Sequence, residues 1–156
     1  MLHVALCQPE IPPNTGNIAR QCVGMDAWLH VIKPINFDLS DRMVRRAGLD
    51  YWDQLKITIH ENPEDFLQWL HNRHPWLVTR HGSIRYDRPE YSDEDILIFG
   101  SETNGLPKGW IDRWPERTLY VPILGKIRNY NLANTVSVVL AHASLKAGRY
   151  EEESKQ

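Results

Sequence analysis

The sequence predicts a single α/β domain with a mainly parallel sheet flanked by helices. Short apolar runs alternate along the chain with longer stretches of helical character, and this alternation is typical of parallel strands joined by helical crossovers. The chain has 156 residues, of which 42% are hydrophobic, so it can build one core but not two ordinary domains. We expect one domain over residues 1–150 and a charged tail, 151–156, that is disordered.

Six apolar runs are expected to form the strands. Each has strand length, and they cover residues 2–7, 28–32, 56–60, 76–79, 96–99 and 119–123.

Four stretches between or after these runs are expected to be helices, at residues 15–25, 41–47, 63–72 and about 132–147. The third has the clearest start, because Asn62 can cap it, Pro63 suits the first turn, and the acidic Glu64 and Asp65 complement the helix dipole. Gly148 is a suitable stop for the last helix. That helix is apolar around most of its circumference, which predicts burial or packing against another subunit.

The composition limits which binding partners and which cellular compartment are expected for the protein. The formal charge of -2 argues against coating nucleic acid by bulk electrostatics, so any RNA must meet a local basic patch. The chain has two cysteines, Cys7 and Cys22, and no disulfide framework, which favours a reducing, cytoplasmic setting. The pattern shows neither a cleavable leader nor a membrane-length apolar stretch, so neither export nor membrane insertion is expected.

Three loops that follow expected strands are the places to look for chemistry, because ligands of open α/β sheets gather at the carboxyl ends of the strands. The first runs from Gln8 to Asn17, is rich in proline, and is followed by Arg20. Asn14 or Thr15 could cap the helix that follows, and Asn17 and Arg20 would share one helical face. The alternative interpretation is an ordinary turn with an exposed arginine.

The second and third loops carry glycines and asparagines. The second, 100–107, holds two glycines that permit tight turns and close approach of the backbone to a ligand, but it matches neither a Walker loop nor a G-x-G-x-x-G fingerprint. The third, 122–134, has three asparagines in or beside a helix N-terminus, where asparagine commonly serves as a cap or in turns. Each loop alone is a weak indication of function.

Other groups of polar residues in the sequence give weaker indications of function. No cysteine or carboxylate set completes a metal site around the scattered histidines, and no activated nucleophile is identifiable. A basic cluster of Arg42, Arg45 and Arg46 could bind RNA phosphates, and a solvated charged face is an equally good interpretation.

Together and in this order, the three loops resemble the three motifs of the SPOUT superfamily of RNA methyltransferases, in its TrmH-like branch. The match spans nearly the whole chain, and PEIPPNTGNIARQC, RRAGLDYW, IFGSETNGLP and NLANTVSVV look especially like the compact TrmL group. The resemblance implies a tRNA 2′-O-ribose methyltransferase that uses S-adenosyl-L-methionine, yields S-adenosyl-L-homocysteine and needs no metal. Its implied target is the wobble nucleotide, position 34, cytidine or modified uridine, of certain leucine tRNAs. It also implies a C-terminal trefoil knot and a homodimer.

Site residues follow from the resemblance, motif by motif. The catalytic set would be Arg20, Asn14 and Asn131, and Arg128 would join the basic cluster in binding RNA. The residues implied to bind the cofactor are Val78, Gly100, Glu102, Gly105, Val121, Ile123, Asn129 and Leu132. Asn129 stands where these enzymes usually carry serine, which bears on activity. Because a protonated guanidinium has no acceptor, we expect Arg20 to stabilise developing alkoxide charge or to anchor a phosphate rather than act as a base.

The sequence alone leaves three alternative functions open. One is a tRNA- or rRNA-binding protein of this fold with impaired catalysis, another is an rRNA 2′-O-methyltransferase, and a third is an unrelated α/β nucleotide-binding enzyme. Cofactor binding without methyl transfer would favour the first, and the missing phosphate-loop signatures count against the third.

Overall fold

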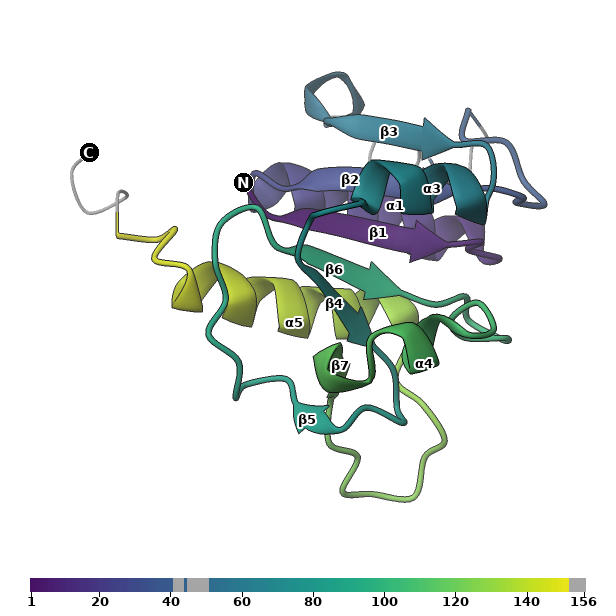
Figure 1. The fold of residues 1–156 in the computed structure, drawn as a ribbon. Helices are drawn as coiled ribbons and strands as arrows, with labels where there is room; N and C mark the ends of the chain where they lie inside the picture. Colours follow the sequence, from purple (N-terminus) through teal and green to yellow (C-terminus); the bar gives the residue numbers. More distant parts are fainter. Residues whose placement is uncertain (41–43, 45–50, 152–156) are drawn as a thin grey trace.

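A seven-stranded sheet forms the centre of the molecule, in a computed structural model that describes residues 1–40, 44 and 51–151 (Figure 1). All its paired strands are parallel, and their order is β3-β2-β1-β6-β4-β7-β5. The strands are β1 His3–Cys7, β2 Trp28–Ile32, β3 Ile57–His60, β4 Pro75–Val78, β5 Ile84–Arg85, β6 Ile96–Phe99 and β7 Thr118–Tyr120. The expected α/β class with a parallel sheet is confirmed.

Helices cover both faces of the sheet. The long helices α1, Pro12–Gly24, and α5, Leu132–Lys146, lie side by side on one face, and α3, Pro63–Leu70, and α4, Trp110–Arg113, lie on the other (Figure 1). Two short 3-10 turns, η1 Trp52–Gln54 and η2 Pro115–Arg117, complete the described elements.

Successive residues of a strand point to opposite faces of the sheet and so pack into two separate hydrophobic cores. Val4 and Leu6 of β1 join the core under α1 and α5, whereas Ala5 and Cys7 join the core under α3 and α4. A strand buried on both faces reads as a continuous apolar run, which is why the strands were visible in the sequence.

Most boundaries agree with the sequence-based expectation within about two residues, but the last strand is a correction. It was expected to reach Ile123, and it ends at Tyr120, where the backbone leaves the sheet to form a long loop. Apolar residues beyond Tyr120 line a cavity instead of continuing the strand. The two-residue strand β5 and the four-residue helix α4 are too short to give a periodic pattern, and the sequence did not predict them.

The predicted helix ends are largely confirmed. Asn62 caps α3 by accepting a hydrogen bond from the backbone N–H of Asp65 at 2.8 Å. Gly148 follows α5 with a φ of 72° and donates its N–H to the carbonyl of Leu145 at 3.1 Å. The expected helix at residues 41–47 lies outside the described residues, apart from Val44, as do Arg42, Arg45 and Arg46 and the tail beyond Glu151.

The remaining general expectations concern cysteines and membranes. Cys7 and Cys22 are both free and buried, and burial raises the pKa of Cys22 to about 12. Within the described part of the chain, none of the helices has both the length and the apolar character needed to cross a bilayer.

A chain of three buried histidines crosses the β1–β2–β3 half of the sheet. A ring nitrogen of His30 lies 2.9 Å from His3 and the other lies 2.9 Å from His60, and Trp69 packs against all three rings. Loss of contact with water lowers the pKa of all three, that of His30 to about 3. At neutral pH the folded protein therefore holds these rings neutral.

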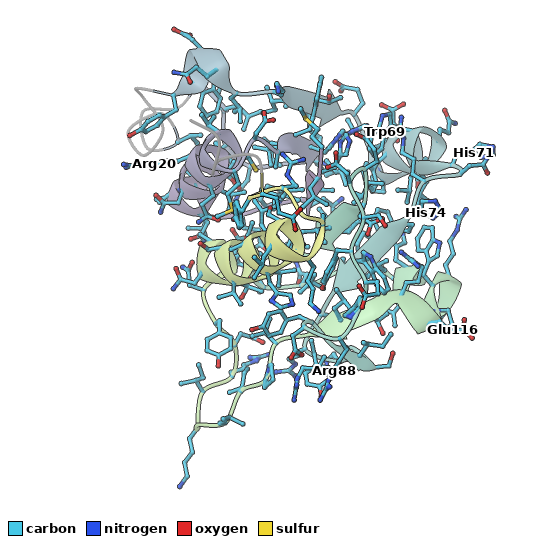
Figure 2. All side chains as sticks on the ribbon, turned by 90° about the vertical axis from the view of Figure 1, so that its left-hand side faces the viewer. Arg20, Trp69, His71, His74, Arg88 and Glu116 are labelled. Atoms are coloured by element: carbon cyan, nitrogen blue, oxygen red, sulfur yellow. The ribbon has the colours of Figure 1, made fainter. Side chains whose placement is uncertain are left out.

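This histidine chain predicts loss of stability in mild acid. Below a pH of about 6.5 the unfolded chain binds protons that folded His30 refuses, so the free energy of unfolding falls as the pH drops, by about 3 kcal/mol at pH 4 from His30 alone. Urea unfolding of the wild type between pH 4 and pH 7.5 measures this slope, and His30→Gln should flatten it. His74→Gln is the matched control, because His74 is exposed at the outer edge of the molecule (Figure 2). An unchanged slope in His30→Gln would contradict the prediction.

Candidate functional site

Three loops meet at the carboxyl edge of the sheet and enclose a cavity of about 470 Å³. They follow β1, β6 and β7, and the segment after β4 adds further lining residues. Parallel strands bring the ends of these strands to the same edge, and a cavity of this size is typical of small-molecule sites.

The structure places nearly all the candidate residues of the described region around this cavity. The eight residues implied to bind the cofactor all line it: Val78, Gly100, Glu102, Gly105, Val121, Ile123, Asn129 and Leu132. Asn14, Asn131 and Arg128 line it as well. Arg20 is the exception.

The glycine loop after β6 closes on itself. Ser101 and Gly105 exchange backbone hydrogen bonds of 3.0 and 3.1 Å, and Gly105 has a φ of 69°, a conformation that favours glycine. A Cβ on Gly100 would overlap the backbone of Gly105 and Leu106. Both glycines are therefore required by the shape of the loop, and both line the cavity.

A chain of polar side chains joins all three loops. Asn14, only 5% exposed, donates its side-chain amide to Glu102 Oε1 at 3.4 Å and accepts a hydrogen bond of 3.0 Å from the side chain of Asn131. Asn131 in turn caps α5 by accepting from the backbone N–H groups of Ala133 and Asn134 at 2.9 and 3.3 Å. The chain fixes the orientation of two amides at the wall of the cavity.

The expected capping role of Asn14 or Thr15 is wrong. The helix α1 begins three residues earlier than its predicted start, at Pro12, and Ile11 takes the N-cap position without a side-chain hydrogen bond. Proline suits the first turn because it lacks an N–H that would otherwise be unsatisfied. Asn14 is thus free to face the other loops.

Hydrogen bonds made by the carboxylates of Glu10 and Glu102 join the first loop to the second. Glu102 accepts from the backbone N–H groups of Glu10 and Ile11 at 2.7 and 3.1 Å, and Glu10 accepts from the N–H and hydroxyl of Thr103 at 3.2 and 2.9 Å. Hydrogen bonds from Thr103 and Ser101 lower the pKa of Glu10. Both carboxylates thus hold the loop backbones in place.

The third loop reaches out from the body of the molecule (Figure 1). The hydroxyl of Tyr130 donates to the carbonyl of Pro122 at 2.8 Å and ties the base of the loop, while the side chain of Leu124 is 97% exposed. Arg128 and Asn129 are exposed on the inner side, where they line the cavity.

Arg20 faces away from the cavity. It lies six residues after Asn14, which on an α-helix corresponds to about 9 Å along the axis and about 120° around it. Figure 2 shows Arg20 at the outer edge on the α1 side, opposite Trp69 and His71. Asn17 lies three residues before Arg20 in α1 and so shares a helical face with it, as the sequence predicted, and both residues are exposed.

Sequence reasoning missed several lining residues. Thr79 and Ile111 had no motif signal, because the first follows a strand and the second sits on a helix of four residues. Tyr130 was present in the third loop but its closure of that loop depends on a backbone carbonyl eight residues away. Arg80 and His81, which follow Thr79, line the cavity as well.

The arrangement suits binding of a ligand that is partly apolar and partly polar. Val78, Val121, Ile123 and Leu132 supply apolar walls, and the Glu102–Asn14–Asn131 chain supplies polar atoms at one side. Among the described residues, no group of three histidine, cysteine or acidic side chains is placed to hold a metal ion.

Comparison with known proteins shows the family and the fold of this chain. The sequence matches the SpoU rRNA Methylase family over residues 1–141. It is 40% identical over 144 residues to the tRNA (cytidine(34)-2'-O)-methyltransferase of Escherichia coli strain K12, with 92% of each chain covered.

Solved structures agree. One, described as "Structural insights into the 2-OH methylation of C/U34 on tRNA", has a TM-score of 0.91 at 35% identity and covers 96% of this chain and 97% of that chain. Another, the SpoU methyltransferase AviRb from Streptomyces viridochromogenes in complex with AdoMet, has a TM-score of 0.80 over 97% of this chain and 61% of that chain. At 23% identity, the second likeness shows the fold alone.

Proposed function

The chain belongs to the SpoU rRNA Methylase family, and from that premise we propose that it is a tRNA 2′-O-ribose methyltransferase that methylates the nucleotide at position 34. The methyl donor in this proposal is S-adenosyl-L-methionine, which a related structure contains. The observation that carries the proposal is that all three motif loops contribute to one cavity, with two oriented asparagines in its wall.

The residues present fit this donor. S-adenosyl-L-methionine supplies a methyl group activated on a sulfonium and leaves as S-adenosyl-L-homocysteine. Val78, Val121, Ile123 and Leu132 offer the apolar walls that an adenine ring requires. The backbone of the Gly100–Gly105 turn offers close polar contacts without side chains in the way.

The protein's own contribution is mainly positioning. Asn14 and Asn131 are held by each other, by Glu102 and by the start of α5, so their free polar atoms are oriented before a ribose arrives. Preorganised polar groups stabilise charge that develops in the transition state. Arg20 is proposed to stabilise the developing alkoxide or to bind the neighbouring phosphate, and the proton passes to phosphate or water.

The finer features of the proposal are a leucine tRNA as substrate, a cytoplasmic setting and a knotted C-terminal segment. The knot is supported by topology, because β7 lies between β4 and β5, which are consecutive along the chain. The chain that leaves β7 for α5 must therefore pass the β4–β5 connection, and Gly82 in that connection packs directly on the backbone of Leu119.

We further propose that the active form is a homodimer in which Arg20 serves the partner's cavity. Arg20 faces away from the cavity of its own chain, and a second copy against α1 and α5 would give it a site. Val138 and Leu145, 43% and 61% exposed and seven residues apart, form an apolar strip on α5 suited to such contact.

Mixing two inactive variants tests the shared site. Arg20→Ala and Asn131→Ala should each lose methyl transfer, and subunit exchange between them should restore about a quarter of wild-type activity, because half of the dimers are mixed and each mixed dimer has one intact site. Each variant mixed with itself is the control. If no activity returns although mass spectrometry shows mixed dimers, Arg20 acts within its own chain.

The function itself is tested by transfer of labelled methyl from S-adenosyl-L-methionine to total tRNA that lacks its natural modifications, followed by nucleoside mapping. A 2′-O-methyl at position 34 is the expected product. Binding of S-adenosyl-L-methionine without product on tRNA or rRNA would favour an RNA-binding protein with impaired catalysis, and product on rRNA alone would reassign the substrate.

A further inference from the structure

The outward face of α1 carries an arginine stacked on an aromatic ring. The guanidinium carbon of Arg20 lies 4.9 Å from the centroid of the Tyr51 ring. Tyr51 precedes the 3-10 turn η1, and its carbonyl accepts a hydrogen bond of 2.9 Å from the N–H of Gln54. Trp52, the next residue, packs against the core under α1 and α5. The ring is therefore anchored to the body of the protein.

The Arg20 guanidinium differs from two of the three other arginines that lie over aromatic rings in the described residues; the third is Arg113, 4.9 Å from the ring centroid of Trp114. Arg73 over Trp69 and Arg117 over Trp76 each donate their Nε–H to a backbone carbonyl, at 3.2 and 2.6 Å. Within residues 1–40, 44 and 51–151, the side chain of Arg20 makes no hydrogen bond and no ion pair. The guanidinium carbon lies over the ring, and Arg20 is an exposed residue.

We propose that Tyr51 is a positioning residue, which holds the Arg20 guanidinium so that its free edge can grip an oxygen anion of the RNA, a backbone phosphate or the reacting ribose oxygen. The inference rests on the proposed methyl transfer and adds a residue to it. Stacking reduces the number of orientations open to a long, exposed side chain, so less entropy is lost when the anion binds. A guanidinium held by its face keeps the two parallel N–H donors that bind an oxyanion in a fork.

The ring, rather than the hydroxyl, should carry this effect. Tyr51→Phe should keep methyl transfer within about twofold of wild type, whereas Tyr51→Leu should lower the rate at saturating tRNA about tenfold, with the dissociation constant of S-adenosyl-L-methionine unchanged. In an Arg20→Gln background the same Tyr51→Leu change should cause no further loss of tRNA binding, the readout used there because replacing Arg20 removes methyl transfer. A merely structural role for the ring would give additive losses instead.

Arg73→Gln is the matched control, because it removes a stacked arginine beside Trp69, at the opposite edge of the molecule (Figure 2). It should leave the rate unchanged. If Tyr51→Leu does not fold, NMR of the wild type decides: the side-chain protons of Arg20 should be shifted upfield by the ring, and normal shifts would overturn the proposal.

The failure of this proposal is distinguishable from failure of the proposed function. Active wild type with additive Tyr51 and Arg20 losses rejects only the positioning role. If the wild type methylates no RNA, the Tyr51 and Arg20 variants are compared by their affinity for tRNA. Losses of affinity that are not additive support the proposed binding of an RNA anion by Arg20, and additive losses reject it.

Discussion

Replacing Gly100 by alanine is expected to lower binding of S-adenosyl-L-methionine and methyl transfer about 100-fold or more. A Cβ at this position would overlap the backbone of Gly105 and Leu106, so the turn that closes the glycine loop must move. A displacement of about 1 Å in a positioned site can cost a factor of about 100 in rate. The strand end before it, Phe99, is fully packed and cannot absorb the shift.

Isothermal titration with S-adenosyl-L-methionine measures the loss, with the melting temperature recorded for each variant. Gly24→Ala is the matched control, since a Cβ on Gly24 meets no atom within 4 Å. A folded Gly100→Ala protein that binds S-adenosyl-L-methionine as well as the control does would show that the cavity described above is not the cofactor site.

The centre of the sheet could be predicted from sequence because four of its strands, β1, β2, β4 and β6, are buried on both faces. The run 96–99 is apolar throughout, the run 28–32 is interrupted only by His30, and both strands have the predicted limits. Short elements carry no such pattern, so β5 and α4 were invisible. The last strand was predicted too long because Val121 and Ile123 are apolar. These two side chains line the cavity and do not extend the strand.

The candidate site was predictable as a set of loops and not as a set of contacts. Asn14 and Asn131 are separated by 117 positions, and no local pattern states that their side chains meet. The hydrogen bond between Glu10 and Thr103 joins residues 93 positions apart, and no local sequence pattern predicts it either. The orientation of Arg20 depends on where α1 begins, because moving the start of a helix changes which residues face the cavity.

Reversing one hydrogen bond in the Glu102–Asn14–Asn131 chain should cost more activity than stability. In Asn131→Asp, a carboxylate can still cap α5, where the helix dipole favours negative charge. It cannot donate to Asn14, however. If the Asn14 amide turns to donate to the new aspartate, its oxygen meets the carboxylate of Glu102. We expect a melting temperature close to wild type and a methyl-transfer rate about 100-fold lower.

The same argument predicts a rescue. With Glu102→Gln added to Asn131→Asp, Asn14 can turn and accept a hydrogen bond from the new amide while donating to the aspartate, so the chain is complete with opposite polarity. Recovery should be partial, about tenfold, because one oxygen that accepts from the N–H of Ile11 becomes a donor. Asn134→Ala is the control for the start of α5, where Asn134 is exposed. Single-turnover rates on tRNA measure all four proteins, and a double variant slower than Asn131→Asp alone would mean that the carboxylate of Glu102 acts through its charge rather than by orienting Asn14.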